Sequence, residues 1–393
     1  MPAEQVRRRR ATRAALYAGG FLGPFGGGMV TVLVPELRDA FGVPTATVSL
    51  ALTVYLVPFA AVQLVSGTLG ERLGRARATR AAFGVYAVAS LAAAVTGAFA
   101  VFLAARAVQG AANAFTTPLV LAALADDTPD AQLGQTMGTF AAVQTAGVVG
   151  APLVGGLAGA VDYRLAFVAA AAAAVVLVLA TAPEQRPRAG AKRATPARLR
   201  DALTPRTRWT AAAAFLAYFA ITGVGVVVAL RAGDAFGLGP SARGLLLAGF
   251  GAAGVVAGRP AGGLADRAGA VRVALAGALP CCGLLPLLGL APEAAALAAA
   301  WLAAGVCSAL LWAGMNVLTV GAAPANRGGA VSLIGAFKFA GNALAPVVWV
   351  ALYGIDVRLA FALAGVASLG VAATVVRAGA APMNFGRTSG LVE

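Results

Sequence analysis

Runs of about twenty apolar residues recur along the chain and constrain its fold more than any other feature. Hydrophobic residues make up 60% of the 393 residues and charged residues only 11%, whereas about a quarter of a soluble domain is charged. An α-helix of roughly 20 residues crosses about 30 Å of hydrocarbon. The sequence therefore predicts an all-α integral membrane protein.

Twelve such runs are separated by mostly short polar segments. They cover residues 14–35, 46–66, 80–99, 102–124, 135–157, 164–182, 209–230, 242–261, 271–290, 295–320, 330–353 and 359–378. A polar, proline-containing stretch divides them six and six. We therefore expect a six-helix bundle over residues 1–182, a basic cytoplasmic linker over 183–208, a second six-helix bundle over 209–380 and a cytoplasmic tail over 381–393.

Positive charge accumulates in alternate segments between the runs. With the amino terminus in the cytoplasm, 22 of the 30 Lys and Arg residues lie on the cytoplasmic side and five on the opposite side. Cytoplasmic loops of membrane proteins carry such an excess, so both termini are predicted to be cytoplasmic. The placement of charge between apolar runs argues against a nucleic-acid partner. We expect a monomer in the lipid bilayer.

The two halves repeat one another. Short motifs of the first half recur in the second at an offset of 194 or 195 residues. They are DAFG at 39–42 and 234–237, GTLGERLG at 67–74 with GGLADRAG at 262–269, DYRLAF at 162–167 with DVRLAF at 356–361, and Gly147 and Ala151-Pro152 with Gly341 and Ala345-Pro346. Transporters with parallel repeats bind substrate near the membrane midplane at the repeat interface. The repeat therefore predicts two pseudo-symmetric bundles around one site.

The segment GTLGERLGRAR, at residues 67–77, follows the second run and faces the predicted cytoplasm. It resembles the signature between helices 2 and 3 of the major facilitator superfamily, although Ala76 replaces one basic position. The resemblance implies a twelve-helix fold in which Glu71 and Asp266 latch the cytoplasmic side. The matching positions are Gly67, Glu71, Arg72, Gly74, Arg75 and Arg77 in the first copy and Gly262, Asp266, Arg267, Gly269 and Arg272 in the second.

A polar helix face begins at Arg106. Arg106, Gln109 and Asn113 are spaced i, i+3 and i+7, so they share one face of the fourth predicted helix. The run RAVQG resembles the superfamily's helix-4 motif, and the resemblance implies that Arg106 and Gln109 take part in proton coupling. The alternative is an Arg106 side chain that reaches the outer interface.

Small residues at fourfold spacing mark the fifth predicted helix. The run GVVGAPLVGG resembles the antiporter motif of the superfamily, with Ala151 in place of a glycine. The resemblance points to the drug:proton antiporter branch and to export; generic helix packing is the alternative. The motif residues are Gly147, Ala151, Pro152, Gly155 and Gly156.

Lys338 lies some eight residues inside the eleventh run, too deep to reach the interface easily. We expect it to bind an anionic substrate or to titrate; an ion pair or hydrogen bond with another helix is the structural alternative. Other polar or aromatic residues at helical spacing are candidates for the same substrate site. They are Asn342, Gln144, Asn113, Phe140, Trp312, Asn316, Tyr218, Phe25 and Met29.

None of the fifteen acids falls firmly inside a run. The nearest are Glu36 and Asp126, at the ends of runs, so proton coupling would depend on one of them or on Lys338. A substrate site whose only buried charges are positive favours an anion.

We expect secondary active transport by alternating access. The expected function is proton-coupled export of a small amphipathic or anionic molecule, a drug or metabolite, through the inner (cytoplasmic) membrane of a bacterium. The alternatives are an anion uniporter or exchanger without proton coupling and a lipid flippase on the same fold. The sequence has no His and no metal-ligand or nucleophile spacing, so we expect no enzyme, no cofactor and no metal.

Overall fold

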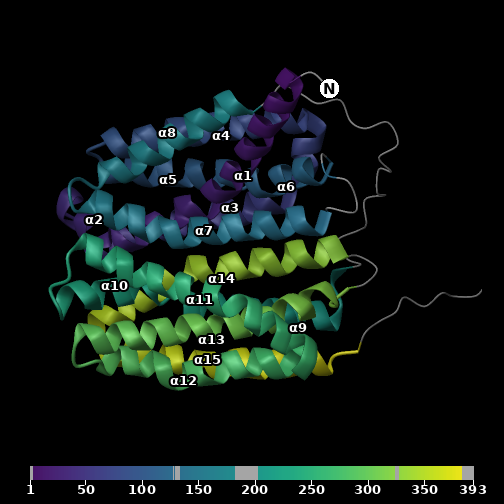
Figure 1. Ribbon diagram of the computed structural model, residues 1–393. Helices are drawn as coiled ribbons and strands as arrows, with labels where there is room; N and C mark the ends of the chain where they lie inside the picture. Colours follow the sequence, from purple (N-terminus) through teal and green to yellow (C-terminus); the bar gives the residue numbers. More distant parts are fainter. Residues whose placement is uncertain (1–2, 127, 129–132, 182–201, 324–326, 383–393) are drawn as a thin grey trace, which may run out of the picture. The chain divides into compact units, whose positions relative to one another are not determined.

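The computed structural model describes residues 3–126, 128, 133–181, 202–323 and 327–382, and these residues are helical apart from short connections (Figure 1). The all-α fold expected from the apolar runs is confirmed. Contacts divide the chain into two compact units, which are described one at a time.

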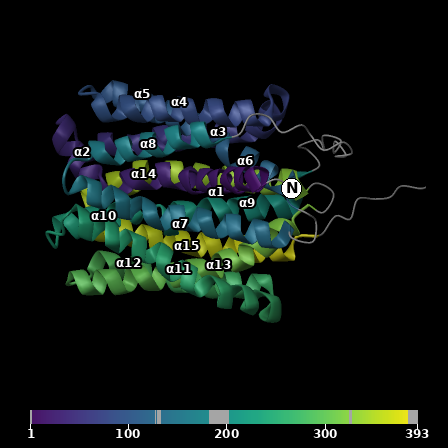
Figure 2. The same ribbon diagram turned by 45° about the horizontal axis from the view of Figure 1, so that its top comes forward.

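Unit 1 comprises Met1–Ala191, Gly225–Ala252 and Pro346–Gly354. Its own helices are α1 (Ala3–Val32), α2 (Val34–Phe41), α3 (Thr45–Leu73), α4 (Arg75–Val95), α5 (Phe99–Asn113), α6 (Thr116–Asp126), α7 (Leu133–Gly159), α8 (Arg164–Ala180) and α10 (Gly225–Asp234). Within the unit, α1 packs along α7, α3 along α5, and α4 along both α5 and α8 (Figure 2). The helices therefore bury their shared faces against one another.

Unit 2 comprises Lys192–Val224, Ala253–Ala345 and Ile355–Glu393. Its own helices are α9 (Pro205–Ala217), the π-helical turn η3 (Tyr218–Thr222), α12 (Ala270–Leu290), α13 (Ala294–Val320) and α15 (Val357–Ala380), and both units share α11 (Pro240–Ala268) and α14 (Arg327–Ile355). Within the unit, α12 packs along α13 and α15, and α9 packs along α15.

Among the described residues, nine helices are long and apolar enough to cross a membrane, and the bent pair of α1 and α2 brings the number to ten. The pair is bent by 64°. The remaining two predicted spans are shorter pieces. Residues 102–124 are split between α5 and α6, and α8 has 17 residues. The exact number of twelve spans stays a prediction, as does their division six and six.

Helices end in the same way in the two sequence repeats. Gly42 and Gly237 follow α2 and α10 with φ of 64° and 63°. Gly74 and Gly269 separate α3 from α4 and α11 from α12 with φ of 87° and 92°. A residue with a Cβ is strained in this region of φ, so glycine is the fitting residue at all four positions. The repeat at an offset of 195 residues is therefore also a repeat of backbone conformation.

Candidate functional site

Arg106 lies at the centre of a buried polar network in unit 1. It is 0% exposed, and its guanidinium lies 4.2 Å from the centre of the Tyr55 ring. Nη1 donates to the carbonyl of Gly26 at 3.1 Å and to Gln109 Oε1 at 2.7 Å. Nε donates to the carbonyl of Ala51 at 3.4 Å. One side chain on α5 thus ties α1 and α3 together through their backbones.

The same network continues along α5. Gln109 Nε2 donates to Ser90 Oγ of α4 at 2.7 Å. Asn113 Nδ2 donates to the carbonyl of Gly23 and to the hydroxyl of Tyr55, both at 2.5 Å. Gln109 and Asn113 are each 0% exposed. The helical spacing correctly placed the three residues on one face, and the "Arg106 network" denotes Arg106, Gln109, Asn113, Tyr55 and Ser90.

Lys338 has quite different surroundings in unit 2. Its Nζ lies 4.9 Å from the ring centre of Tyr218, 5.7 Å from that of Trp312 and 4.7 Å from that of Phe339. These distances fall within the range of cation–π attraction. The four side chains, called the Lys338 cage, come from η3, α13 and α14, and each is half-buried.

The polar atoms of the Lys338 cage are not paired with any part of the chain that the structure describes. Lys338 Nζ, the Tyr218 hydroxyl and the Trp312 indole N–H make no hydrogen bond or ion pair with any residue that the structure describes. The same holds for the amide of Asn342, one turn further along α14. Sequence reasoning selected these residues but missed Phe339, because adjacent helical residues point in different directions and only the flexible Lys338 side chain brings them together.

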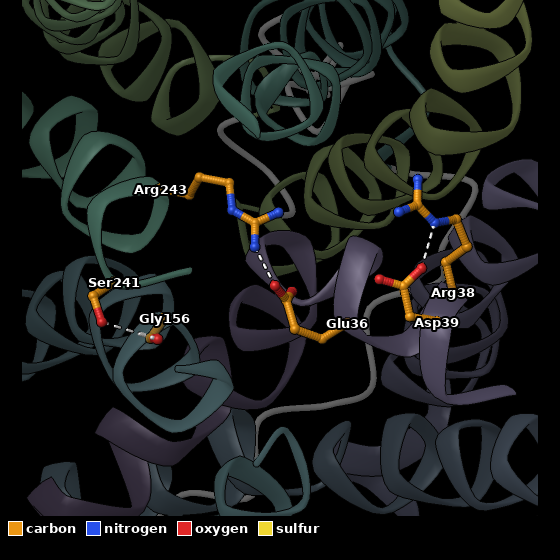
Figure 3. A network of polar contacts seen from close by, with 6 residues as sticks. All are labelled: Glu36, Arg38, Asp39, Gly156, Ser241 and Arg243. Carbon is orange, nitrogen blue, oxygen red and sulfur yellow. Dashed lines mark hydrogen bonds and ion pairs between the residues drawn. The ribbon is translucent and has the colours of Figure 1, made fainter. Parts of the chain in front are cut away.

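A third charged cluster lies where α2 approaches the first part of α11, which belongs to unit 1 (Figure 3). Arg243 Nη2 donates to Glu36 Oε1 across 207 residues of sequence. The two side chains are only 4% and 18% exposed, and Glu36 Oε2 has no hydrogen-bond partner in the described chain. The neighbouring pair Arg38–Asp39, at 2.9 Å, is 41% and 71% exposed. The buried pair, unlike its neighbour, joins the two sequence repeats.

The helix-5 motif packs against α1. A Cβ on Gly155 would lie 2.5 Å from the carbonyl oxygen of Met29, and one on Gly147 would also meet an α1 carbonyl. Ala151 is fully buried, and α7 continues through Pro152. Small residues at these positions therefore allow the two helices to approach closely.

The last motif residue, Gly156, packs against α11 near the Glu36–Arg243 pair. A Cβ there would lie 2.5 Å from the carbonyl of Pro240 and 3.0 Å from Gly244 Cα. Ser241 Oγ donates to the carbonyl of Gly156 at 3.4 Å (Figure 3). The motif therefore contributes to the same end of unit 1 as the ion pair.

Four of the other predicted substrate residues belong to unit 1 and one, Asn316, belongs to unit 2. Phe25, Met29 and Phe140 are 4%, 0% and 3% exposed, so none of these side chains is accessible to a substrate in this structure. Gln144 donates weakly to Thr117 Oγ1 at 3.5 Å in unit 1. Asn316 is exposed on α13, one turn from Trp312.

The predicted cytoplasmic latch is only partly described. The side chains of Glu71 and Asp126 lie outside the described residues. Asp266 is exposed and makes no hydrogen bond or ion pair with a described residue. The latch therefore stays a prediction.

The chain is similar to a known protein family in sequence and to known proteins in fold. The family model of the Major Facilitator Superfamily matches residues 16–230 and 210–384. A bacterial homologue of the human lysosomal transporter Spinster, inward-facing and occupied, has a TM-score of 0.80 at 15% identity and covers 97% of this chain and 99% of its own. A D-xylose-proton symporter has a TM-score of 0.78 at 16% identity, with 96% and 99% covered.

The human organic anion transporter MFSD10 has a TM-score of 0.66 at 16% identity, with 95% of this chain and 100% of its own covered. No curated protein sequence matches the chain. At such identities the structural likeness shows the fold alone.

Proposed function

The chain is a secondary transporter of the Major Facilitator Superfamily, and we propose that it exports a small amphipathic or anionic molecule in exchange for protons. The site of action is the cytoplasmic membrane of a bacterium. One observation carries the choice of an anion: Lys338 in α14 has aromatic neighbours but no acidic or hydrogen-bonding partner among the described residues.

A cation inside an apolar helix is expensive unless water or a partner compensates it. Cation–π contacts supply about 0.5–2 kcal/mol, which leaves much of the desolvation unbalanced. A negative group on a substrate would supply the missing charge. Lys338 therefore acts as the principal binding group for the anion.

We assign to Glu36 the role of carrying the exchanged proton. Its carboxylate holds the buried Arg243 in an ion pair and has a second oxygen without a partner among the described residues. Protonation would remove the negative charge and weaken the pair, so that α2 and α11 could separate. Entry of a proton at this predicted outer end would then accompany release of the anion, and the helix-5 motif supports this export direction.

The test uses proteoliposomes that contain a pH-sensitive dye, with the membrane potential clamped by potassium and valinomycin. External hexanesulfonate or benzenesulfonate, which keep their charge at neutral pH, is added as the probe. Exchange predicts that anion entry drives protons out and makes the lumen alkaline, and that Glu36→Gln abolishes this response. Acidification of the lumen would instead indicate cotransport and overturn the proposal.

An anion exchanger without protons is the second candidate. It is favoured by the absence of an acid beside Lys338 in the described part of the chain. Counterflow of labelled anion that is the same with and without an imposed pH gradient would establish it.

A further inference from the structure

We infer that the Lys338 cage binds an aromatic anion, with a carboxylate or sulfonate against the ammonium of Lys338 and a planar ring against the indole of Trp312. The inference rests on the proposed function and narrows its substrate class from amphipathic anions to aromatic ones. Three features of unit 2 carry it: the donors, the rings and the backbone at Tyr218.

The unpaired groups of the cage, and the Asn342 amide one turn further along α14, can donate to an anion. Lys338 Nζ and the Trp312 indole N–H are donors only, while the Tyr218 hydroxyl and the Asn342 amide can also donate. None has a hydrogen-bond partner within the described residues. An aromatic site for an organic cation would instead leave its rings free to receive the ammonium. Here Lys338 already occupies that position, so the site favours a negative ligand.

The rings hold the ammonium and also offer apolar surface. Tyr218 meets Trp312 edge to face, with ring centres 5.2 Å apart and an interplanar angle of 77°. Phe339 lies 6.3 Å from Tyr218. Because the rings are half-buried, part of their surface stays uncovered by the protein. Aromatic rings favour offset or edge-on neighbours, which a ring on the ligand can supply.

The backbone at Tyr218 is unusual. Tyr218 begins a π-helical turn, closed by the Gly223 amide donating to the Tyr218 carbonyl at 2.8 Å. Such turns are rare and often occur at functional sites. The repeat aligns Tyr218 with Gly23, where α1 is regular, and Lys338 with Gln144. The cage is therefore a specialisation of the second copy, which general packing of the repeat does not require.

The test compares matched probes on the purified full chain by saturation-transfer NMR. Benzenesulfonate and cyclohexanesulfonate share charge and carbon number, and phenyltrimethylammonium reverses the charge. We expect benzenesulfonate to bind about tenfold more tightly than cyclohexanesulfonate, a difference of about 1.4 kcal/mol. The cation should bind at least as weakly as cyclohexanesulfonate. These comparisons need no variant.

Three variants test whether Lys338 and Trp312 are responsible for the binding of the sulfonates. Lys338→Gln should weaken both anions about tenfold, and Trp312→Leu should remove the preference for the aromatic anion. Arg259→Gln, a control that removes another positive charge of unit 2, should change neither affinity. Thermal unfolding confirms that each variant is folded.

Equal affinity for the two sulfonates, or tighter binding of the cation, would overturn the inference. Anion-driven proton movement with hexanesulfonate would still support the proposed function in that case. Conversely, tight benzenesulfonate binding without proton movement would refute proton exchange and leave the aromatic site intact.

Discussion

Arg106 and Lys338 both place a positive charge within apolar helices, yet their surroundings differ. Arg106 is fully buried and donates to two backbone carbonyls and to Gln109. Lys338 is half-buried against three rings and donates to no described residue. A guanidinium can serve several fixed acceptors at once, whereas an ammonium is a compact charge on a flexible stem. Arg106 makes three hydrogen bonds within unit 1, although its Nη2 has no partner among the described residues, whereas Lys338 makes no hydrogen bond with a described residue of unit 2.

This difference indicates that a charge in a membrane helix can have a structural role or a ligand-binding role. A charge that the fold satisfies holds helices together, because its removal leaves buried partners without hydrogen bonds. A charge that the fold leaves open is available to a ligand. The comparison predicts that variants at Arg106 chiefly change stability and that variants at Lys338 chiefly change transport.

The largest effect is expected for Arg106→Gln. The change removes the guanidinium's hydrogen bonds to the carbonyls of Gly26 and Ala51, and charged hydrogen bonds contribute about 1.5–3 kcal/mol each. We expect a loss of several kcal/mol in the free energy of unfolding, measured by denaturation in detergent. Arg106→Lys should recover only part of it. Normal stability with loss of proton coupling would instead give Arg106 the coupling role that its motif implies.

Lys338→Gln is expected to reduce anion flux at least tenfold, which corresponds to about 1.4 kcal/mol of binding energy. The melting temperature should stay unchanged, because no described hydrogen bond is lost and the lost cation–π contacts are offset by the relief of the desolvation cost. Flux in proteoliposomes and thermal unfolding of the same preparation measure both quantities. A variant that transports normally but unfolds earlier would make Lys338 a structural residue and remove the contrast with Arg106.

Glu36→Gln tests a charge that has an ion-pair partner, unlike Lys338, but is not fully buried, unlike Arg106. The change leaves Arg243, whose side chain is 4% exposed, without its counter-charge. We expect a new population of longer distances between spin labels at Ala40 and Ser241, which report on α2 and α11. About 1 kcal/mol of lost pairing would change the populations about fivefold.

The matched control for this experiment is Asp39→Asn. It breaks the exposed pair with Arg38, whose partners are 41% and 71% exposed, and such pairs contribute little. The label distances should therefore match those of the unmodified chain. Identical distances in Glu36→Gln and Asp39→Asn would show that the buried pair does not hold the two helices together.

Much of this architecture could be predicted from sequence because it depends on local rules. Apolar runs predicted the helices, and the DAFG repeat predicted two similar halves, to which the structure adds the matching backbone at Gly42 and Gly237. Helical spacing also placed Arg106 beside Gln109 and Asn113. Long-range pairing was harder to predict: nothing local indicates that Glu36 meets Arg243, because the residues are 207 positions apart.

The substrate candidates show a second limit. Phe140 and Trp312 are both aromatic residues at helical spacing, yet Phe140 packs in an apolar cluster with Val120 and Leu124. Trp312 contributes to the Lys338 cage. Sequence periodicity identifies a face but not what covers it. Sequence periodicity also could not predict the π-helical turn at Tyr218, because helical spacing assumes a regular α-helix.

The smallest effect is expected when a tyrosine hydroxyl is removed from the Arg106 network or from the Lys338 cage. Tyr55→Phe removes a hydroxyl that accepts from Asn113 at 2.5 Å but keeps the ring beside Arg106. We expect it to lower the free energy of unfolding by about 1 kcal/mol. Tyr218→Phe removes a hydroxyl that has no partner among the described residues, so stability should change by at most a few tenths of a kcal/mol. Benzenesulfonate binding should weaken only in Tyr218→Phe, because only that hydroxyl is free to meet the ligand. Equal losses of stability in the two variants would mean that both clusters are equally satisfied by the fold, and the distinction between a structural and a binding charge would then have to be abandoned.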